Sequence, residues 1–299
     1  MILFQRVLRR KIFMKRNDEM EQKKILEILN LSSESEKAVI LALSKKKISE
    51  ISKTAYLGEI SDFPILRLKP VTRLAVVVHL ICGKYDDYLS LGVPPKIIED
   101  TFRDISLRAE LYLNEKGKTG ISKNDALWFR HTINCQIFKV GVLQFQAFEM
   151  IYLDKEFLGE TYMEFSKAQK EKLPSGSPVI NCHIQTGADL SNDRVALSFS
   201  DAQRLFEKLF PDRKYRAFIC YSWLLYPDMT ELLPKGSKIK SFTENFEVIG
   251  SISDSEQAFE NIFGKAYKRP PKLQAPTALQ KLASENPKTF GFACGVKYL

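Results

Sequence analysis

The sequence is poor in cysteine and has no long apolar run. Its five cysteines are odd in number, widely scattered and never arranged as CxxC, which argues against a disulfide framework and against a structural zinc site. The longest apolar stretch, residues 74–82, is interrupted by His79 and is far shorter than the roughly 18 residues that a transmembrane helix needs. We therefore expect a cytoplasmic protein without a membrane span and without a bound metal.

Several common catalytic motifs are missing as well. The sequence contains no GxxxxGK[ST], GxGxxG, HExxH or GxSxG, so the commonest nucleotide-binding, zinc-protease and serine-hydrolase sites are excluded. Apolar residues make up 44% of the chain and charged residues 27%, a composition typical of a globular protein rather than a disordered one. A length of 299 residues predicts two domains or one large domain.

Positive charge is in excess but is unevenly placed. Of the net +9, six charges come from residues 1–16, which contain no acid, so the rest of the chain carries only +3. The apolar run in this segment is too short for a secretion signal. We interpret residues 1–17 as a basic leader that is disordered, an amphipathic anchor, transit-like or not native. The nearly balanced body argues against a nucleic-acid partner.

Residues 18–120 have the pattern of a helical domain. Ser33 to Glu36 form a capping-box signature before an apolar helical face. Pro70 can open a helix that is apolar nearly all round, and a further helix starts at Pro94 and Pro95 and should end near Lys116. The polar, glycine-containing segment 114–124 is the predicted linker.

The periodicity changes in residues 121–299, which we predict to form a second domain. Residues 137–152 alternate in polarity and are rich in strand formers, with Gly141 at a hairpin turn or bulge. Two strands, at 179–185 and 215–225, enclose a helix at 200–210, so a parallel pair with one crossover helix is expected. The remaining predicted elements are helices at 125–132, 254–264 and 277–285 and a closing strand near 289–298. A helical domain followed by a mixed-sheet domain is an α+β fold with an α/β unit.

The strand at 179–185 carries the first candidate site residue. Because side chains alternate along a strand, Asn181, His183 and Gln185 share one polar face. If the two central strands are neighbours, His183 lies near Tyr221 or Ser222, which pairs a base that titrates near neutral pH with a hydroxyl. The alternative interpretation is a hydrogen-bonded histidine with a purely structural role in the sheet.

Two other groups have a functional and a structural interpretation. His131 and Cys135 are one helical turn apart if the helix continues, which could activate a thiolate, although a helix-end histidine and a core cysteine are the commoner arrangement. Lys235, Lys238 and Lys240 could receive phosphates or could form a solvated face.

Five longer segments resemble a known family. They are LGVPPKIIEDTFRDI at 91–105, WFRHTINCQIFKVGVLQF at 128–145, YRAFICYSWLL at 215–225, LLPKGSKIKSF at 232–242 and TALQK at 277–281. Together they resemble a bacterial two-domain family of N-acyltransferases, with a helical N-terminal domain and a GNAT-like C-terminal acyltransferase domain.

The resemblance implies an activity and a set of site residues. In GNAT folds two parallel strands splay apart and the pantetheine arm of acyl-CoA lies between them, so acetyl-CoA or another acyl-CoA is the expected co-substrate and a small-molecule or peptide amine the acceptor. His183 or Glu149 would be the base and Tyr221 or Ser222 the acid. The positions that would bind acyl-CoA are Cys182, Ile184, Gln185, Gly187, Arg194, Ser198, Ser200 and Trp223.

The chain departs from the family pattern at two places. Its pyrophosphate segment, TGADLSNDRVALSFSD, has Gly187 as the only glycine, and no tyrosine occurs between Tyr226 and Tyr267, where the family helix supplies one. Arg194 and the amides near Ser198 or Ser200 could replace the usual loop. A non-catalytic module that senses acyl-CoA or serves as a scaffold is the alternative function.

Overall fold

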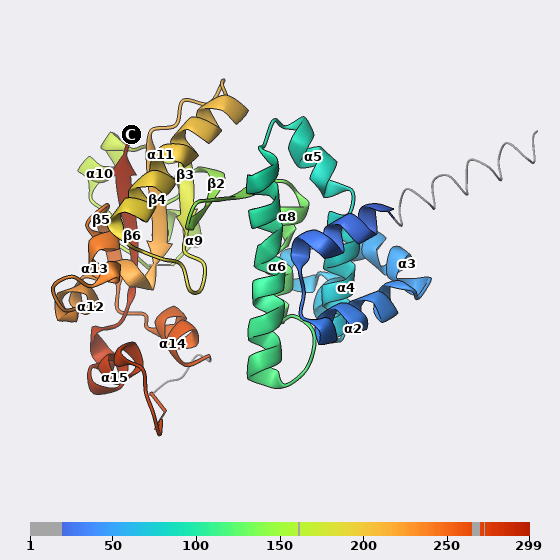
Figure 1. Ribbon diagram of the computed structural model, residues 1–299. Helices are drawn as coiled ribbons and strands as arrows, with labels where there is room; N and C mark the ends of the chain where they lie inside the picture. Colours follow the sequence, from blue (N-terminus) through green and yellow to red (C-terminus); the bar gives the residue numbers. More distant parts are fainter. Residues whose placement is uncertain (1–19, 161, 265–269, 272) are drawn as a thin grey trace, which may run out of the picture. The chain divides into compact units, whose positions relative to one another are not determined.

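The computed structural model describes residues 20–160, 162–264, 270, 271 and 273–299. The predicted leader, residues 1–17, lies outside the described residues. The chain divides into two compact units, Met1–Lys139 and Val140–Leu299 (Figure 1). Among the described helices, none combines the length and the apolar character needed to cross a membrane.

The first unit is built from helices. A helix at residues 20–29 is followed by α2 (Ser33–Leu43), α3 (Lys47–Thr54), η1 (Ile60–Asp62), η2 (Pro64–Arg67), α4 (Pro70–Ile81), α5 (Lys84–Ser90), α6 (Pro95–Lys116), α7 (Lys123–Trp128) and α8 (Arg130–Ile133).

Local sequence explains where these helices begin and what they bury. Proline occupies the first turn of both α4 and α6, where its missing N–H costs nothing. The cap of α2 is Ser32, whose hydroxyl accepts from Ser35 N–H, one residue earlier than the predicted cap. Residues 74–78 of α4 are completely buried, as expected for an apolar helix at the centre of a bundle.

The division between the units falls later in the chain than the boundary expected near residue 120. Ile121 is fully buried, its N–H donates to Pro70 C=O at 3.3 Å, and its own C=O accepts from Arg73 Nε at 3.0 Å. Further along, the Tyr88 hydroxyl donates to Thr132 C=O at 3.2 Å and to Ile137 C=O at 3.0 Å. These bonds hold α7 and α8 to the helical unit.

The second unit is a mixed sheet with helices. Its strands are β1 (Ile137–Val140, which crosses the boundary), β2 (Leu143–Glu149), β3 (Pro178–His183), β4 (Ala217–Ser222), β5 (Glu247–Ile252) and β6 (Phe292–Tyr298), in the order β1-β2-β3-β4-β6-β5. The pair β3 and β4 is parallel, and β2 with β3, β4 with β6 and β5 with β6 are antiparallel. The helices are α9 (Lys155–Leu158), α10 (Lys167–Lys172), α11 (Asn192–Leu209), η3 (Trp223–Leu225), α12 (Pro227–Leu232), α13 (Lys238–Thr243), α14 (Glu256–Phe263), α15 (Ala278–Glu285) and η4 (Pro287–Thr289).

Several elements differ from the sequence-based expectation: α9, α10, α12 and α13 were not predicted, and the strand expected at 215–225 ends at Ser222, where η3 follows. Two further differences have a clear physical reason. Helix α11 begins at Asn192, earlier than the predicted start at residue 200, because its first turns bury only Val195, Ser198 and Phe199 and so carry a weak apolar pattern. Strand β5 was not predicted at all. A register shift between Val248 and Gly250 breaks the alternation that marks a strand.

Each face of the sheet has its own core. Helix α11 lies across one face (Figure 1), where the Phe199 ring contacts those of Phe145 at 5.7 Å and Phe218 at 4.9 Å. The opposite face is covered by a cluster that includes Met150, Tyr152 and Leu173. Because side chains alternate, every strand residue can be assigned to the α11 face or to the opposite face.

Candidate active site

The two parallel strands of the sheet pair over only part of their length. Their ladder consists of Val179 with Ala217, Ile180 with Phe218 and Asn181 with Ile219. Strand β3 continues to His183 and β4 to Ser222, and within the described chain no further residue pair joins them. The carboxyl-terminal halves therefore separate, which leaves a gap in the middle of the sheet.

His183 lies at the end of β3, next to this gap. Its register partner on β2 is Gln144, and its Nε2 lies 3.4 Å from Gln146 Oε1, a long hydrogen bond. An amide oxygen can only accept, so Nε2 carries the proton when this bond forms. The side chain is on the face opposite α11 and is partly exposed.

Tyr221 and Ser222 lie on different faces of β4, so only one of them shares the face of His183. Tyr221 is on that face, where its hydroxyl donates to Ile151 C=O and burial raises its pKa far above the usual range. Ser222 is on the α11 face, buried, and its Oγ accepts from Leu224 N–H at 3.2 Å at the start of η3. Both hydroxyls therefore have a structural partner.

Glu149, the alternative base, lies at the other end of the β2–β3 pair from His183 and from the gap. In the register of β2 and β3, Gln144 is opposite His183 while Glu149 is opposite Pro178. Five residues of strand separate the two positions by about 17 Å. Glu149 is exposed, and its carboxylate lies 3.8 Å from Arg213. The structure does not bring these two sequence-predicted bases together.

The loop after β3 runs directly from the gap to the start of α11. Ala188 N–H donates to Gln185 C=O at 3.0 Å, which closes a turn in which Gly187 has a φ of 78°. Asp189 follows, and hydrogen bonding to Lys238 Nζ, at 2.7 Å, is the main cause that holds the pKa of this carboxyl below its usual value. Lys238 opens α13. Sequence reasoning grouped it with a lysine run and could not place it at this loop.

The three residues predicted along α11 have different environments. Arg194 is exposed in the first turn, where the helix dipole favours anions, and Ser200 is exposed further along. Ser198 is completely buried; its hydroxyl donates to Arg194 C=O at 2.8 Å and accepts from Val142 N–H at 2.9 Å. Ser198 therefore supports the turn between β1 and β2.

The other predicted acyl-CoA contacts are divided between the gap and the core. Ile184 and Gln185 are partly buried and follow the end of β3. Cys182 is 1% exposed on the α11 face, in register with Phe145. Trp223 is buried in η3, where its ring lies 6.5 Å from that of Phe290.

Cys135 is not an activated thiolate. Helix α8 ends at Ile133, and Cys135 has a φ of 53°, so it does not continue the helix of His131. Burial raises the pKa of the Cys135 thiol to about 11, which keeps it protonated at neutral pH.

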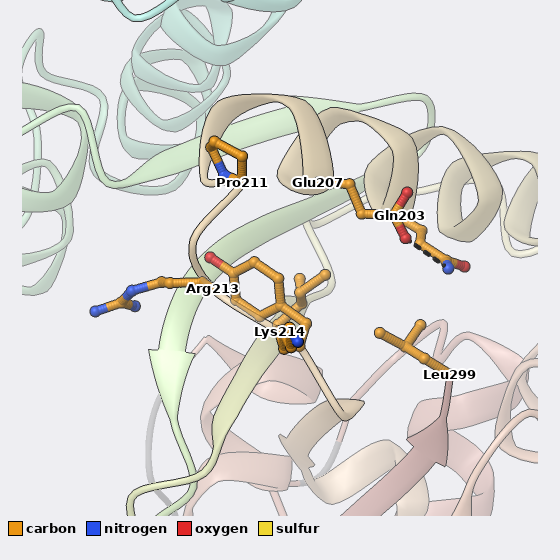
Figure 2. A pocket seen from close by; sticks show the side chains of 8 residues that line it. Gln203, Glu207, Pro211, Arg213, Lys214 and Leu299 are labelled. Carbon is orange, nitrogen blue, oxygen red and sulfur yellow. Dashed lines mark hydrogen bonds between the residues drawn. The ribbon is translucent and has the colours of Figure 1, made fainter.

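A small pocket lies at the other end of the parallel pair. It has a volume of about 230 Å³ and is lined by Ile180, Gln203, Glu207, Pro211, Arg213, Lys214, Tyr215 and Leu299 (Figure 2). Tyr215 comes before β4, and Ile180 belongs to the paired part of β3. This pocket is therefore separate from the gap beside His183.

Comparisons with known proteins identify the two units. Residues 20–135 match the model of an N-acyltransferase N-terminal domain, and residues 137–295 match the model of a GNAT-like C-terminal domain. The chain belongs to this two-domain N-acyltransferase family. The family resemblance expected from the five sequence segments is thus confirmed, as is the α+β fold class.

Solved structures with the same fold are acyltransferases. One, a complex with decanoyl-CoA and teicoplanin, has 15% sequence identity and a TM-score of 0.71, and the match covers 93% of this chain and 87% of that one. A second, with decanoyl-CoA, has 18% identity, a TM-score of 0.68 and the same coverage. A third, an acyltransferase mutant with octanoyl-CoA, has 15% identity and a TM-score of 0.71, over 94% of this chain and 88% of that one. A comparison with curated protein sequences gives no match.

Proposed function

We propose that this N-acyltransferase uses acyl-CoA, which binds in the gap between β3 and β4, and that it transfers the acyl group to the amine of a small molecule. The observation that carries the proposal is the end of the β3–β4 ladder at Asn181 and Ile219, beyond which both strands continue unpaired with each other. Backbone groups that lack a neighbouring strand can bond to an extended ligand with amide groups, such as a pantetheine arm.

The phosphates of acyl-CoA have a matching position beside the gap. The loop at 184–191 leads into the start of α11, where backbone N–H groups and the helix dipole favour an anion. Arg194 in the first turn and Lys238 from α13 bring positive charge to the same loop. Lys238 adds a second positive charge at this loop, where it is paired with Asp189.

His183 is the base of this proposal. Its Nδ1 would take a proton from the acceptor nitrogen as that nitrogen attacks the thioester carbonyl. Gln146, which holds Nε2, sets the tautomer and the orientation of the ring. Glu149 has no part in this step, because the strand register places it about 17 Å away.

The acyltransferases with similar structures support the choice of ligands. They were solved with decanoyl-CoA, with octanoyl-CoA and, in one complex, with teicoplanin. We extend from them the acyl-CoA co-substrate and a small-molecule acceptor, and we place acyl chains of eight to ten carbons alongside acetyl among those to be tested.

Calorimetric titration with acetyl-CoA and with decanoyl-CoA tests binding. We expect at least one of them to bind, and Lys238→Ala to weaken that binding by about fivefold through the loss of one phosphate contact. Lys235→Ala is the matched control, since Lys235 belongs to the same lysine run but precedes α13. Absence of binding by either acyl-CoA would overturn the proposal.

The alternative, an acyl-CoA-binding module without catalysis, is favoured by the engaged hydroxyls of Tyr221 and Ser222. Thiol release from the bound acyl-CoA in the presence of amines separates the two functions. Enzyme-dependent release that His183→Ala abolishes, with acyl-CoA binding retained, would exclude the binding module. Binding without any release would instead favour it.

A further inference from the structure

Asn181 is a buried polar residue with an unmet hydrogen bond. Its side chain is 8% exposed, and its Oδ1 finds no hydrogen-bond partner among the residues that the structure describes. A buried acceptor without a donor destabilises the folded state, so such groups are rare and call for an explanation. In the described chain the same condition applies to two other atoms, Ser35 Oγ and Tyr215 Oη.

The position of Asn181 in the sheet distinguishes it from Ser35 and Tyr215. It forms the last residue pair of the β3–β4 ladder, so it stands where the gap begins. Its side chain lies on the face opposite α11, as does that of His183, and the two positions are about 6.6 Å apart along the strand. On the neighbouring strand its register partner is Gln146, which binds His183 Nε2.

The missing partner must be a hydrogen-bond donor, because the amide oxygen of Asn181 can only accept. Asn181 Oδ1 therefore stands on the same face of β3 as His183, the base of the proposed function, at the head of the gap. A neutral primary amine has two N–H bonds and one lone pair. It can give one proton to the base, donate its other N–H to Asn181 Oδ1 and still direct the lone pair at a thioester carbonyl.

We propose that Asn181 is a positioning residue whose Oδ1 accepts an N–H of the acceptor nitrogen during acyl transfer. This inference rests on the function proposed above. The C–N bond forms as the C–S bond breaks, and the electron pair of the C–S bond leaves with the CoA sulfur. His183 removes one proton from the nitrogen, and that proton is returned to the sulfur, which yields an amide and free CoA thiol. The second N–H stays on Asn181 Oδ1 throughout.

The decisive variant is Asn181→Leu, which keeps the number and branching of the side-chain heavy atoms and removes the unmet acceptor. Two matched controls remove the other unmet atoms: Ser35→Ala in the helical unit, and Tyr215→Phe in the same unit as Asn181 but beside the remote pocket (Figure 2). All three should leave the melting temperature unchanged or raise it by about 2 °C, because each removes a desolvated polar group.

Activity is measured as CoA thiol release from saturating decanoyl-CoA, with hydroxylamine as a small primary amine that is uncharged near neutral pH. Asn181→Leu should lower the hydroxylamine-dependent kcat/KM by about tenfold or more and leave the Kd of decanoyl-CoA within about twofold of wild type. Ser35→Ala and Tyr215→Phe should keep wild-type activity. N-methylhydroxylamine, with one N–H on nitrogen, should be a poor acceptor for the wild type, and the preference should vanish in Asn181→Leu.

Two results would overturn this inference and leave the proposed function standing: wild-type transfer by Asn181→Leu, and a loss of decanoyl-CoA affinity that accounts for the whole effect. A wild type that binds decanoyl-CoA without any hydroxylamine-dependent release would overturn the inference and favour the binding module. A variant that melts at a lower temperature and loses activity only in proportion to its folded fraction would show a structural role and would also overturn the inference. Failure of the wild type to bind any acyl-CoA would instead remove the proposed function itself.

Discussion

Two buried polar side chains, Asp104 in the helical unit and Asn181 in the sheet unit, differ in whether their hydrogen bonds are satisfied. In the helical unit Asp104 is 1% exposed and accepts from Arg108 Nε, at 3.2 Å, and from Trp128 Nε1, at 2.9 Å. In the sheet unit Asn181 is almost as buried, yet its Oδ1 has no donor among the described residues. A buried polar group with its partners in place stabilises the fold, whereas an unmet acceptor such as Asn181 Oδ1 calls for an explanation, which we propose is the acceptor substrate.

The largest loss of stability should come from removing Asp104, the carboxylate whose hydrogen bonds are satisfied. Asp104→Ala leaves the Arg108 guanidinium and the Trp128 N–H without their shared acceptor, so we expect a loss of about 3 kcal/mol in the free energy of unfolding. Urea denaturation measures it. Asp100→Ala is the control on the same helix: Asp100 pairs with Lys96 at 2.6 Å but is more exposed, and its loss should cost less than about 1 kcal/mol. Equal losses of unfolding free energy for Asp104→Ala and Asp100→Ala would contradict the distinction between a buried, hydrogen-bonded carboxylate and a more exposed ion pair.

A smaller loss of stability is expected at Ser198. Its hydroxyl both donates and accepts a hydrogen bond inside the protein, although the sequence predicted that it contacts acyl-CoA. Ser198→Ala removes the acceptor of Val142 N–H and should cost about 1–2 kcal/mol. Ser200→Ala, on the exposed side of the same helix, should change stability by less than about 0.5 kcal/mol. Thermal unfolding compares the two, and decanoyl-CoA affinity should be the same in Ser198→Ala and wild type. If Ser198→Ala folds normally but binds decanoyl-CoA more weakly than wild type, Ser198 contacts acyl-CoA as the sequence predicted.

The smallest expected effect is on the pH dependence of stability and comes from His131. This side chain is half-buried and hydrogen-bonded to Gln136 at 3.3 Å. Burial, and then the charge of Arg130, hold the pKa of His131 below its usual 6.5. The folded state thus prefers the neutral ring, so the stability this gives is present above pH 6.5 and is lost as the pH falls below that value. The melting temperature of wild type should drop more between pH 7.5 and pH 5.5 than that of His131→Gln, by about 2 °C or less. A steeper drop in the variant would mean that His131 is charged in the folded protein.

Sequence reasoning found the elements whose signals are local. Pro70 and Pro95 mark helix starts because proline is favoured in a first turn, and the buried α4 follows from an apolar run too short for a membrane. The parallel pair was predicted from two strands separated by one crossover helix, and it is present as β3 and β4. Strand β5 was missed because its irregular register hides the alternation.

Predicting the site required information that the sequence does not carry. Alternation alone put Asn181 and His183 on one face, but the face of Ser222 and the distance of Glu149 depend on register between strands. Lys238 reaches Asp189 across 49 residues of sequence, a contact that no local pattern encodes. The unmet acceptor of Asn181 is visible only once its surroundings are packed.

The short ladder between β3 and β4 makes this sheet two three-stranded halves, β1-β2-β3 and β4-β6-β5, joined along a seam of three residue pairs. Helix α11 crosses that seam, and its Phe199 ring packs on Phe145 from one half and on Phe218 from the other. On the opposite face the Tyr221 hydroxyl, from β4, donates to Ile151 C=O, which follows β2. The halves are therefore joined on both faces by contacts that do not depend on the strand ladder, so the sheet stays in one piece although its central ladder is short.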